Sequence, residues 1–412
     1  MSPVNDLLPF WPPHSDLFVL AVALLGAALF GESAARFWRL PRILGYTVAG
    51  MALGPLALGW LGPRQFADFR VFIDLAVALL LFELGIRVDL RWLRANPAIL
   101  AGSLAEAGLA FGGVFGVLQW LGVATTLSLA VAAIAIASSP AIALRVSSDC
   151  RASGQVTERM LLLTALNMVY ALVALHFVLG WLHSSHGRGA AAAFFHPLYR
   201  LAGSVLAAVA LAFVFRRLRN AFDIADEQAS ALLFGLLLLV MALLQTARLP
   251  TLLAPLLAGM LVKLGDPRPH LFPRHFGSAG SLLVMLMFVF TGALADGPLL
   301  LGSAVAGCAV VLVRALAKAA AATALGPLAG LSWRQAGALG LALWPLCGVA
   351  LGMTGELTRL YPDFGRQLLG ILLVAILVMQ LLGPVALRLA LGRAGETHAE
   401  RAAPPGRTSH AP

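Results

Sequence analysis

Two basic side chains interrupt an apolar run in the second half of the chain, at Arg314 and Lys318. They are four residues apart, so on a helix they share one face. An earlier apolar run holds an acidic residue, Glu106, among small residues. A lysine can give up its proton when a cation arrives, and a carboxylate can carry a proton, so charges at membrane depth indicate an ion or proton pathway. Lys318, Glu106 and Arg314 are therefore candidates for an ion- or proton-binding site.

Each of these residues also has a structural interpretation. For Lys318 it is an ion pair with Glu106 or a contact with a helix-end carbonyl, and both interpretations stay open. Arg314 cannot lose its proton, which favours a structural role. Glu83 is another acidic candidate, but Arg87 follows it closely, so its carboxylate can reach the membrane surface. The other ionisable candidates are Asp74, Glu356 and His176, and the histidine is expected to be packed and hydrogen-bonded.

Two apolar runs contain helix-breaking residues near their centres. One reads Ser138-Ser139-Pro140, and the other reads Pro345-Leu346-Cys347-Gly348. Proline removes a helical hydrogen bond, and serine hydroxyls can bind carbonyls that a break leaves unpaired. A single break is commonly a packing kink, whereas paired breaks present helix dipoles and free carbonyls to an ion. We therefore take Ser138 and Ser139 as candidate ion ligands, and Pro140, Pro345 and Gly348 as break positions.

The composition indicates how these residues are positioned. Of 412 residues, 60% are hydrophobic and 12% are charged, against roughly 25% charged residues in soluble domains. Apolar runs of about 20 residues, the length of a membrane-spanning helix, recur along the chain. The predicted fold class is an all-α polytopic membrane protein, with a single transmembrane domain over residues 1–392. We expect about thirteen spans, near 17–37, 42–59, 71–86, 98–121, 124–144, 159–182, 197–216, 228–247, 249–264, 279–296, 299–326, 335–356 and 367–392.

The charge pattern predicts the orientation. The net charge of +10 does not indicate nucleic acid, because the basic residues gather in short loops. With the N-terminus outside, 20 Lys and Arg lie on the inner side and seven lie on the outer side, as the positive-inside rule requires. The C-terminus is then cytoplasmic, and residues 393–412 are expected to be a disordered tail. The spacing of the three cysteines predicts no disulfide framework, metal site or cofactor, and no nucleophile–base set indicates an enzyme.

A short pattern recurs in the two halves. Leu40-Pro41 is followed, seven residues later, by Ala49-Gly50-Met51. Leu249-Pro250 is followed at the same spacing by Ala258-Gly259-Met260, an offset of 209. The repeated spans are seven apart in the predicted order, and this odd number means that the two copies cross the membrane in opposite directions.

The repeat extends to the next span and to the breaks. Gly85 and Gly292 correspond at an offset of 207, and the offset of 209 carries Ser139 onto Gly348. Inverted repeats are typical of secondary transporters, whose site lies near the bilayer midplane at interrupted helices. The sequence therefore predicts transport through a site between the two breaks.

At these positions the chain resembles the monovalent cation:proton antiporters, in particular the Kef-type and sodium/proton exchangers. The run Leu40-Pro41-Arg42-Ile43-Leu44-Gly45-Tyr46 resembles the first signature of that family, and Leu79-Leu80-Leu81-Phe82-Glu83-Leu84-Gly85 resembles the second. Further similarity lies at 256–259, 288–292, 314–318 and 330–340, so the resemblance covers most of residues 17–390.

The resemblance implies a sodium/proton antiporter-like fold with two crossed, discontinuous helices, working as a homodimer in the cell inner membrane. It implies secondary active exchange of Na⁺ or K⁺ against H⁺ by an elevator-like alternation. Lys318 matches the basic residue of the family's core. The implied division is scaffold helices near 17–86 and 228–296, core helices near 98–182 and 299–392, and a linker helix near 197–216.

One position departs from the family pattern. The sixth span of the family carries a residue pair that ends in the aspartate that binds cation and proton, whereas this chain reads Asn167-Met168. Asn167 fits the first position and is a candidate ligand, but a thioether neither takes up a proton nor competes with water for a hard cation. Either Glu106 has taken over, or the solute differs and is an anion attracted to Lys318 and Arg314. A non-transporting or partner-regulated homologue and an uncoupled channel also stay open as interpretations.

Overall fold

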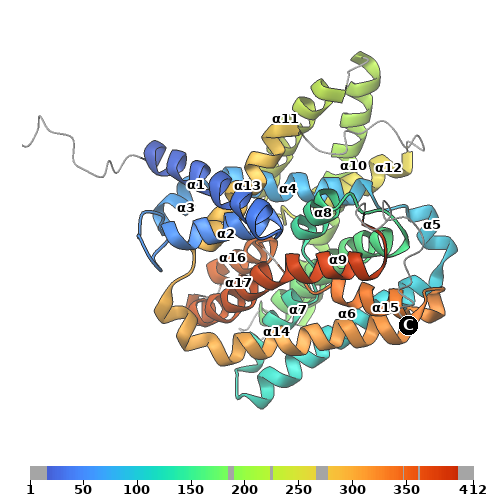
Figure 1. Ribbon diagram of the computed structural model, residues 1–412. Coiled ribbons are helices and arrows are strands. Elements are labelled where there is room, and N and C mark those ends of the chain that lie inside the picture. The colour runs from blue at the N-terminus through green and yellow to red at the C-terminus, as the bar shows by residue number, and fades with distance from the viewer. Residues whose placement is uncertain are drawn as a thin grey trace, which may run out of the picture.

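The computed structural model describes residues 16–183, 190–222, 226–265, 277–346, 348–360 and 362–397 (Figure 1). All secondary structure in these ranges is helical. The helices are α1 (Asp16–Phe37), α2 (Arg42–Leu53), α3 (Pro63–Asp68), α4 (Arg70–Ile86), α5 (Leu90–Ala95), α6 (Pro97–Trp120), α7 (Thr125–Ala135), α8 (Pro140–Asp149), α9 (Gln155–His183), α10 (Ala190–Phe222), α11 (Asp226–Thr246), α12 (Leu253–Gly265), α13 (Gly277–Ala293), α14 (Gly297–Leu325), α15 (Trp333–Ala342), α16 (Val349–Leu360) and α17 (Pro362–Arg393), with a 3₁₀ turn at Pro327–Ala329.

The predicted all-α membrane fold is confirmed. Each predicted span overlaps a helix, and the fifth and twelfth spans are each divided into two helices, α7 with α8 and α15 with α16. Within the described residues, eight helical segments are long and apolar enough to cross a membrane, and α2, α12 and most of α13 are shorter apolar helices. The short helices α3 and α5 lie in connections and were not predicted.

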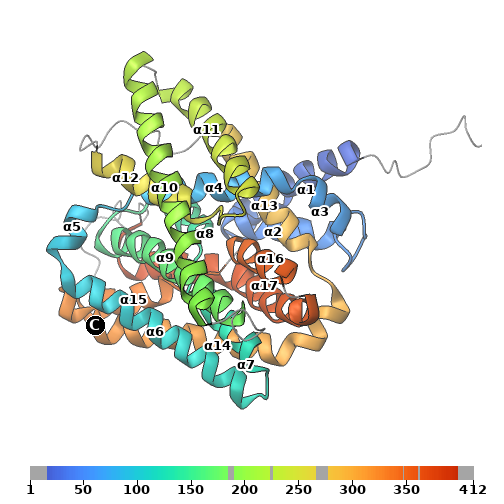
Figure 2. The same ribbon diagram turned by 180° about the vertical axis from the view of Figure 1, so that it is seen from behind.

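The helices pack in two groups. In the first, α1 and α13 pack against α2, and α12 packs against α4. In the second, α14 packs against α6, α15 and α17, and α7 packs against α6 and α9. The long helix α10 contacts α12 of the first group and α9 of the second. Figures 1 and 2 show α10 and α11 projecting on one side of the molecule, with α6 and α14 along the opposite side.

Two helix crossings show the repeat in three dimensions. In the crossing of α2 with α13, a Cβ added to Gly50 would lie 2.0 Å from the carbonyl oxygen of Val289. In the crossing of α12 with α4, a Cβ added to Gly259 would lie 2.3 Å from the carbonyl oxygen of Phe82. The two glycines are related by the offset of 209, and their two contacts by the offset of 207. Each crossing thus joins a helix of one half to a helix of the other, which confirms the inverted repeat.

The backbone just before each copy of the Leu-Pro pair is also alike. Arg39 has φ +52° and Arg248 has φ +54°, a conformation that is uncommon for a residue other than glycine. The residues are again 209 apart. The repeat therefore preserves the backbone conformation of the turn that precedes α2 and α12. This similarity begins one residue before the Leu-Pro pair.

The chain makes specific contacts beyond the end of α17. The buried carboxylate of Glu396 accepts hydrogen bonds from the backbone N–H groups of Val156 and Thr157, both at 2.8 Å. These belong to the first turn of α9, where free N–H groups and the helix dipole favour an anion. The predicted tail boundary at 393 is therefore too early, since Glu396 and Thr397 belong to the folded part. Residues 398–412 lie outside the described residues.

The glycine crossings give a stability prediction. Gly50→Ala and Gly259→Ala each place a methyl group against backbone, and overpacking of this kind costs about 1–3 kcal/mol. We expect each variant to unfold at a lower temperature than the parent in detergent, followed by tryptophan fluorescence. Gly235→Ala is the matched control, because a Cβ there meets no atom within 4 Å. Equal melting temperatures for all three variants would contradict the close crossings.

Candidate ion-binding site

The two broken helices meet where their helical hydrogen bonding stops. The backbone N–H of Ser139 donates to the carbonyl oxygen of Pro345 at 2.9 Å. The hydroxyl of Ser138 donates to the carbonyl oxygen of Leu343 at 3.2 Å. The breaks predicted separately in the fifth and twelfth spans therefore bind each other directly, and the prediction of crossed discontinuous helices is confirmed.

Local sequence explains the first break. Ser139 is the N-cap of α8, and its hydroxyl oxygen accepts from the backbone N–H of Ile142 at 3.1 Å. Pro140 occupies the first helical position, where the missing N–H costs no hydrogen bond. Ser139 is thus occupied in starting the helix, while the hydroxyl of Ser138 faces the opposite break.

Arg314 on α14 binds the carbonyls that the breaks leave unpaired. Its guanidinium donates to the carbonyl oxygens of Ala135 at 2.8 Å and Ala137 at 2.5 Å on one side. On the other side it donates to the carbonyl oxygens of Trp344 and Pro345. The side chain is 1% exposed. A planar group with five donors is suited to such a position, and these contacts fit the structural interpretation of Arg314.

Lys318 lies one turn further along the same face of α14. Its ammonium group forms an ion pair and a hydrogen bond with the carboxylate of Glu106 on α6. It also donates to the carbonyl oxygen of Ile136 at 2.9 Å and to the hydroxyl of Ser138 at 3.2 Å. Lys318 is 0% exposed and Glu106 is 2% exposed. Lys318 and Glu106, whose pairing the sequence left open, are therefore in direct contact.

Asn167 extends this network onto α9. Its amide nitrogen donates to the hydroxyl of Ser138 at 3.3 Å, and its amide oxygen has no hydrogen-bond partner among the described residues. One turn along α9, Tyr170 shares a hydrogen bond of 2.9 Å with Ser103, which lies one turn before Glu106 on α6. Met168, next to Asn167, is fully buried. The oxygen-bearing side chains of α6 and α9 in this network thus lie on the sides of the two helices that face each other.

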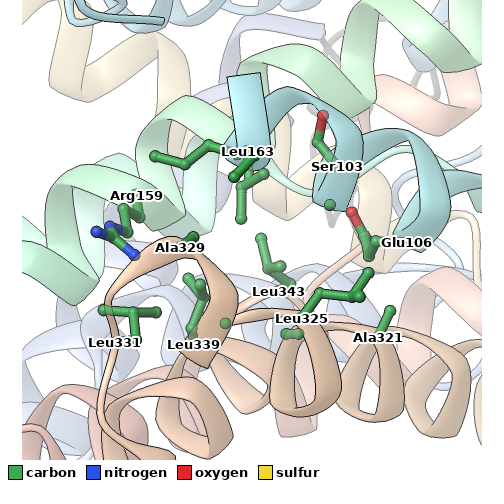
Figure 3. Close-up of a pocket in the computed structure, with 15 residues that line it drawn as sticks. Ser103, Glu106, Arg159, Leu163, Ala321, Leu325, Ala329, Leu331, Leu339 and Leu343 are labelled. Carbon is green, nitrogen blue, oxygen red and sulfur yellow. The ribbon is translucent and has the colours of Figure 1, made fainter. Parts of the chain in front are cut away.

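A small pocket reaches the network from one end of the bundle. Glu106 and Ser103 line it together with Arg159 from the start of α9, and its volume is about 40 Å³, enough for a few water molecules. Figure 3 shows Glu106 and Arg159 on opposite sides of this pocket, with Leu339 and Leu343 between them. The second carboxylate oxygen of Glu106 is buried and lacks a partner in the described part of the chain.

Other candidates lie outside the network. Glu83 is buried and pairs with Arg87, one turn later on α4, at 3.4 Å. Asp74 pairs with Arg70 at 3.5 Å. His176 is packed and lies 2.6 Å from the carbonyl oxygen of Leu172. The side chains of Glu356 and Cys347 lie outside the described residues.

Gln380 is one of several buried polar residues that were not predicted from the sequence. Gln380 on α17 is 0% exposed, and neither its amide oxygen nor its amide nitrogen has a partner among the described residues. Three residues later on the same face, a Cβ on Gly383 would lie 3.0 Å from the side chain of Pro345. Gln380 therefore lies about one turn from the part of α17 that packs against the second break. In the sequence, the feature that could have identified this residue is its amide side chain within an otherwise apolar run.

The sequence that folds into this arrangement of crossed breaks around a buried lysine also matches a known protein family. Residues 20–391 match the model of the sodium/hydrogen exchanger transmembrane region. The chain belongs to the sodium/hydrogen exchanger family. The family assignment agrees with the resemblance found in the two signatures, and the chain is a multi-pass membrane protein.

Curated relatives match over shorter stretches. The iron transporter MagA of Paramagnetospirillum magneticum is 34% identical over 147 residues, which cover 33% of this chain and 31% of MagA. The Na(+)/H(+)-K(+) antiporter GerN of Bacillus cereus is 33% identical over 79 residues, 19% of this chain and 20% of GerN. The matched stretches thus span a third or less of these two relatives.

The fold is shared along the whole chain with a solved structure. The sodium proton antiporter MjNhaP1 from Methanocaldococcus jannaschii matches with a TM-score of 0.72 and 14% identity, over 96% of each chain. Its structure at pH 8 matches with a TM-score of 0.67 and 17% identity, over 91% of this chain and 95% of that one. At this identity the match shows the fold alone.

The role of Arg314 gives a second prediction. Arg314→Met leaves several buried carbonyls without a donor, and each unsatisfied group costs about 1–3 kcal/mol. We expect a large fall in the melting temperature in detergent, with loss of the monodisperse peak in size-exclusion chromatography. Arg217→Met, an exposed arginine on α10, is the control. An Arg314→Met variant as stable as this control would contradict the carbonyl-binding role.

Proposed function

We propose that this protein exchanges a monovalent cation, Na⁺ or K⁺, against protons, with Lys318 and Glu106 as the exchanging pair. The observation that carries the proposal is the buried ion pair between these residues, hydrogen-bonded through Ser138 to Asn167 where the broken helices cross. Membership of the sodium/hydrogen exchanger family supports the reaction class. The relative GerN and the structural match MjNhaP1 are both named as antiporters, which also supports this reaction class.

The chemistry follows from the atoms around the ammonium group. The oxygens close to Lys318 are the Glu106 carboxylate, the Ile136 carbonyl and the Ser138 hydroxyl. Alkali cations prefer oxygen ligands of these kinds, as hard cations do generally. When Lys318 gives up a proton, the same oxygens become available to a cation. Cation and proton then compete for one site, which is the requirement for exchange.

Glu106 supplies the carboxylate in this mechanism. Met168 lies beside Asn167 but offers only a thioether, which binds neither a proton nor a hard cation. The carboxylate of Glu106 reaches the same network from α6, through its contact with Lys318. We therefore infer that an acid on α6 does the work of the missing acid on α9, with Asn167 and Ser138 as further ligands.

An anionic solute has less support. The charge of Lys318 is balanced by Glu106, and the guanidinium of Arg314 is surrounded by backbone carbonyls, which repel anions. Within the described residues, neither cation of α14 is left to attract a negative group.

The membrane arrangement completes the proposal. We place the chain in the cell inner membrane with its N-terminus outside and its C-terminus in the cytoplasm, supported by the distribution of Lys and Arg. The pocket beside Glu106 then opens towards the cytoplasm. We assign the first helix group to a scaffold that forms a homodimer and the second to a moving core, with α10 as the linker, supported by the packing within each group.

Proton flux in proteoliposomes tests the proposal. With an imposed pH gradient and a fluorescent pH probe, Na⁺ or K⁺ is expected to dissipate the gradient in the parent protein. Glu106→Gln and Lys318→Met are expected to lower this flux at least about tenfold, because each removes one exchanging group. Lys263→Met is the matched control, since Lys263 is the other lysine of the chain and lies on α12.

The outcomes separate the competing interpretations. Flux in both site variants equal to that of the Lys263→Met control would contradict the assignment of Glu106 and Lys318. A silent parent protein together with an active Met168→Asp variant would mean that the fold can exchange ions but that the native protein does not.

A further inference from the structure

A second cavity, far larger than the pocket at Glu106, lies where α1, α8 and α17 end and α2 begins. Its volume is about 1150 Å³. Arginines from five segments line it, and the only acidic residue among its lining residues is Asp149. The arginines are Arg39, Arg42, Arg151, Arg334, Arg388 and Arg393. We refer to this cavity as the arginine cavity.

The charge in the arginine cavity is largely uncompensated. Asp149 lies 3.9 Å from Arg42, which also pairs with Glu32 at 3.2 Å. In the part of the chain that the structure describes, Arg42 is the one arginine of the set in an ion pair with a carboxylate. Positive side chains scattered over loops satisfy the positive-inside rule without converging. Six arginines around one hollow concentrate a positive potential, which attracts anions.

One helix end adds to the attraction. Pro41 is the N-cap of α2 and lines the cavity, so the positive end of this helix dipole lies at the wall and favours an anion. The C-terminal ends of α1, α8 and α17 at the same cavity favour the arginine side chains instead.

Arg39 and Arg151 are both held at positive φ, +52° and +46°. The guanidinium of Arg388 also binds the carbonyl oxygen of Arg39, so α17 holds the α1–α2 turn in place.

From these observations we propose that the arginine cavity binds an anion that carries two or more phosphate groups. Arginine forms paired hydrogen bonds to phosphate, and a single phosphate engages only part of six guanidinium groups. The cavity is as large as typical small-molecule sites. The phosphates can come from a lipid headgroup or from a soluble polyphosphate. The anion would bridge the α1–α2 turn of the first helix group to α15 and α17 of the second, and to the end of α8.

The site is tested by binding, which does not require that the protein transports ions. Inorganic pyrophosphate is added to the full-length protein in detergent, and the melting temperature is compared with that in sodium chloride of equal ionic strength. In parallel, the protein is mixed with vesicles of phosphatidylcholine alone or of phosphatidylcholine with an equal amount of cardiolipin. The test variant is Arg151→Gln/Arg334→Gln, and the control is Arg94→Gln/Arg217→Gln, which removes the same charge from exposed positions outside the cavity.

We expect pyrophosphate to raise the melting temperature of the parent and of the control variant, with an affinity at least about tenfold weaker in the test variant. The same dependence on Arg151 and Arg334 seen only with cardiolipin vesicles would assign the site to a lipid headgroup and would also support it. Binding that neither arm detects, or that falls equally in the two variants, would overturn the proposal.

Discussion

The structure depends on how backbone carbonyls are satisfied where two membrane helices stop and start again inside the protein. A broken helix leaves several carbonyls without partners, and in an apolar interior each one destabilises the fold. Here α7 and α15 both end in the middle of the bundle. One helix, α14, places the positively charged side chains of Arg314 and Lys318 in the gap between them. Because Arg314 and Lys318 are four residues apart, a single helix face serves both breaks.

The two cations differ in what they make possible. Arg314 keeps its charge and binds carbonyls on both sides of the crossing, so it fixes the breaks against each other. Lys318 can lose its proton, and it is held by one carboxylate, one carbonyl and one hydroxyl. In the proposed exchange, a permanent charge thus maintains the geometry, and an exchangeable charge lies next to it. This division explains how a site can change its occupancy without the loss of the helix crossing.

Much of this arrangement could be predicted from the sequence. Hydropathy and length located the spans, proline located the breaks, and the repeated Leu-Pro and Ala-Gly-Met positions predicted an inverted repeat. The pairing of Glu106 with Lys318 could not be decided, because sequence spacing fixes which residues share a helix face but not which faces of distant helices meet. Gln380 was missed since a lone amide in an apolar run resembles many packed residues. Glu396 was missed because the composition of the tail indicated disorder, whereas one carboxylate at the start of α9 anchors its beginning.

If a cation and the proton of Lys318 compete for the same oxygens, as we propose, the binding of a cation must release a proton. Purified protein in detergent is placed in a weakly buffered solution with a pH indicator, and NaCl or KCl is added against a choline chloride control. We expect the parent protein to release protons when the cation binds. Lys318→Met is expected to release none, while Lys263→Met behaves like the parent. Cation binding by the parent without proton release, or equal release from Lys318→Met, would contradict the claim.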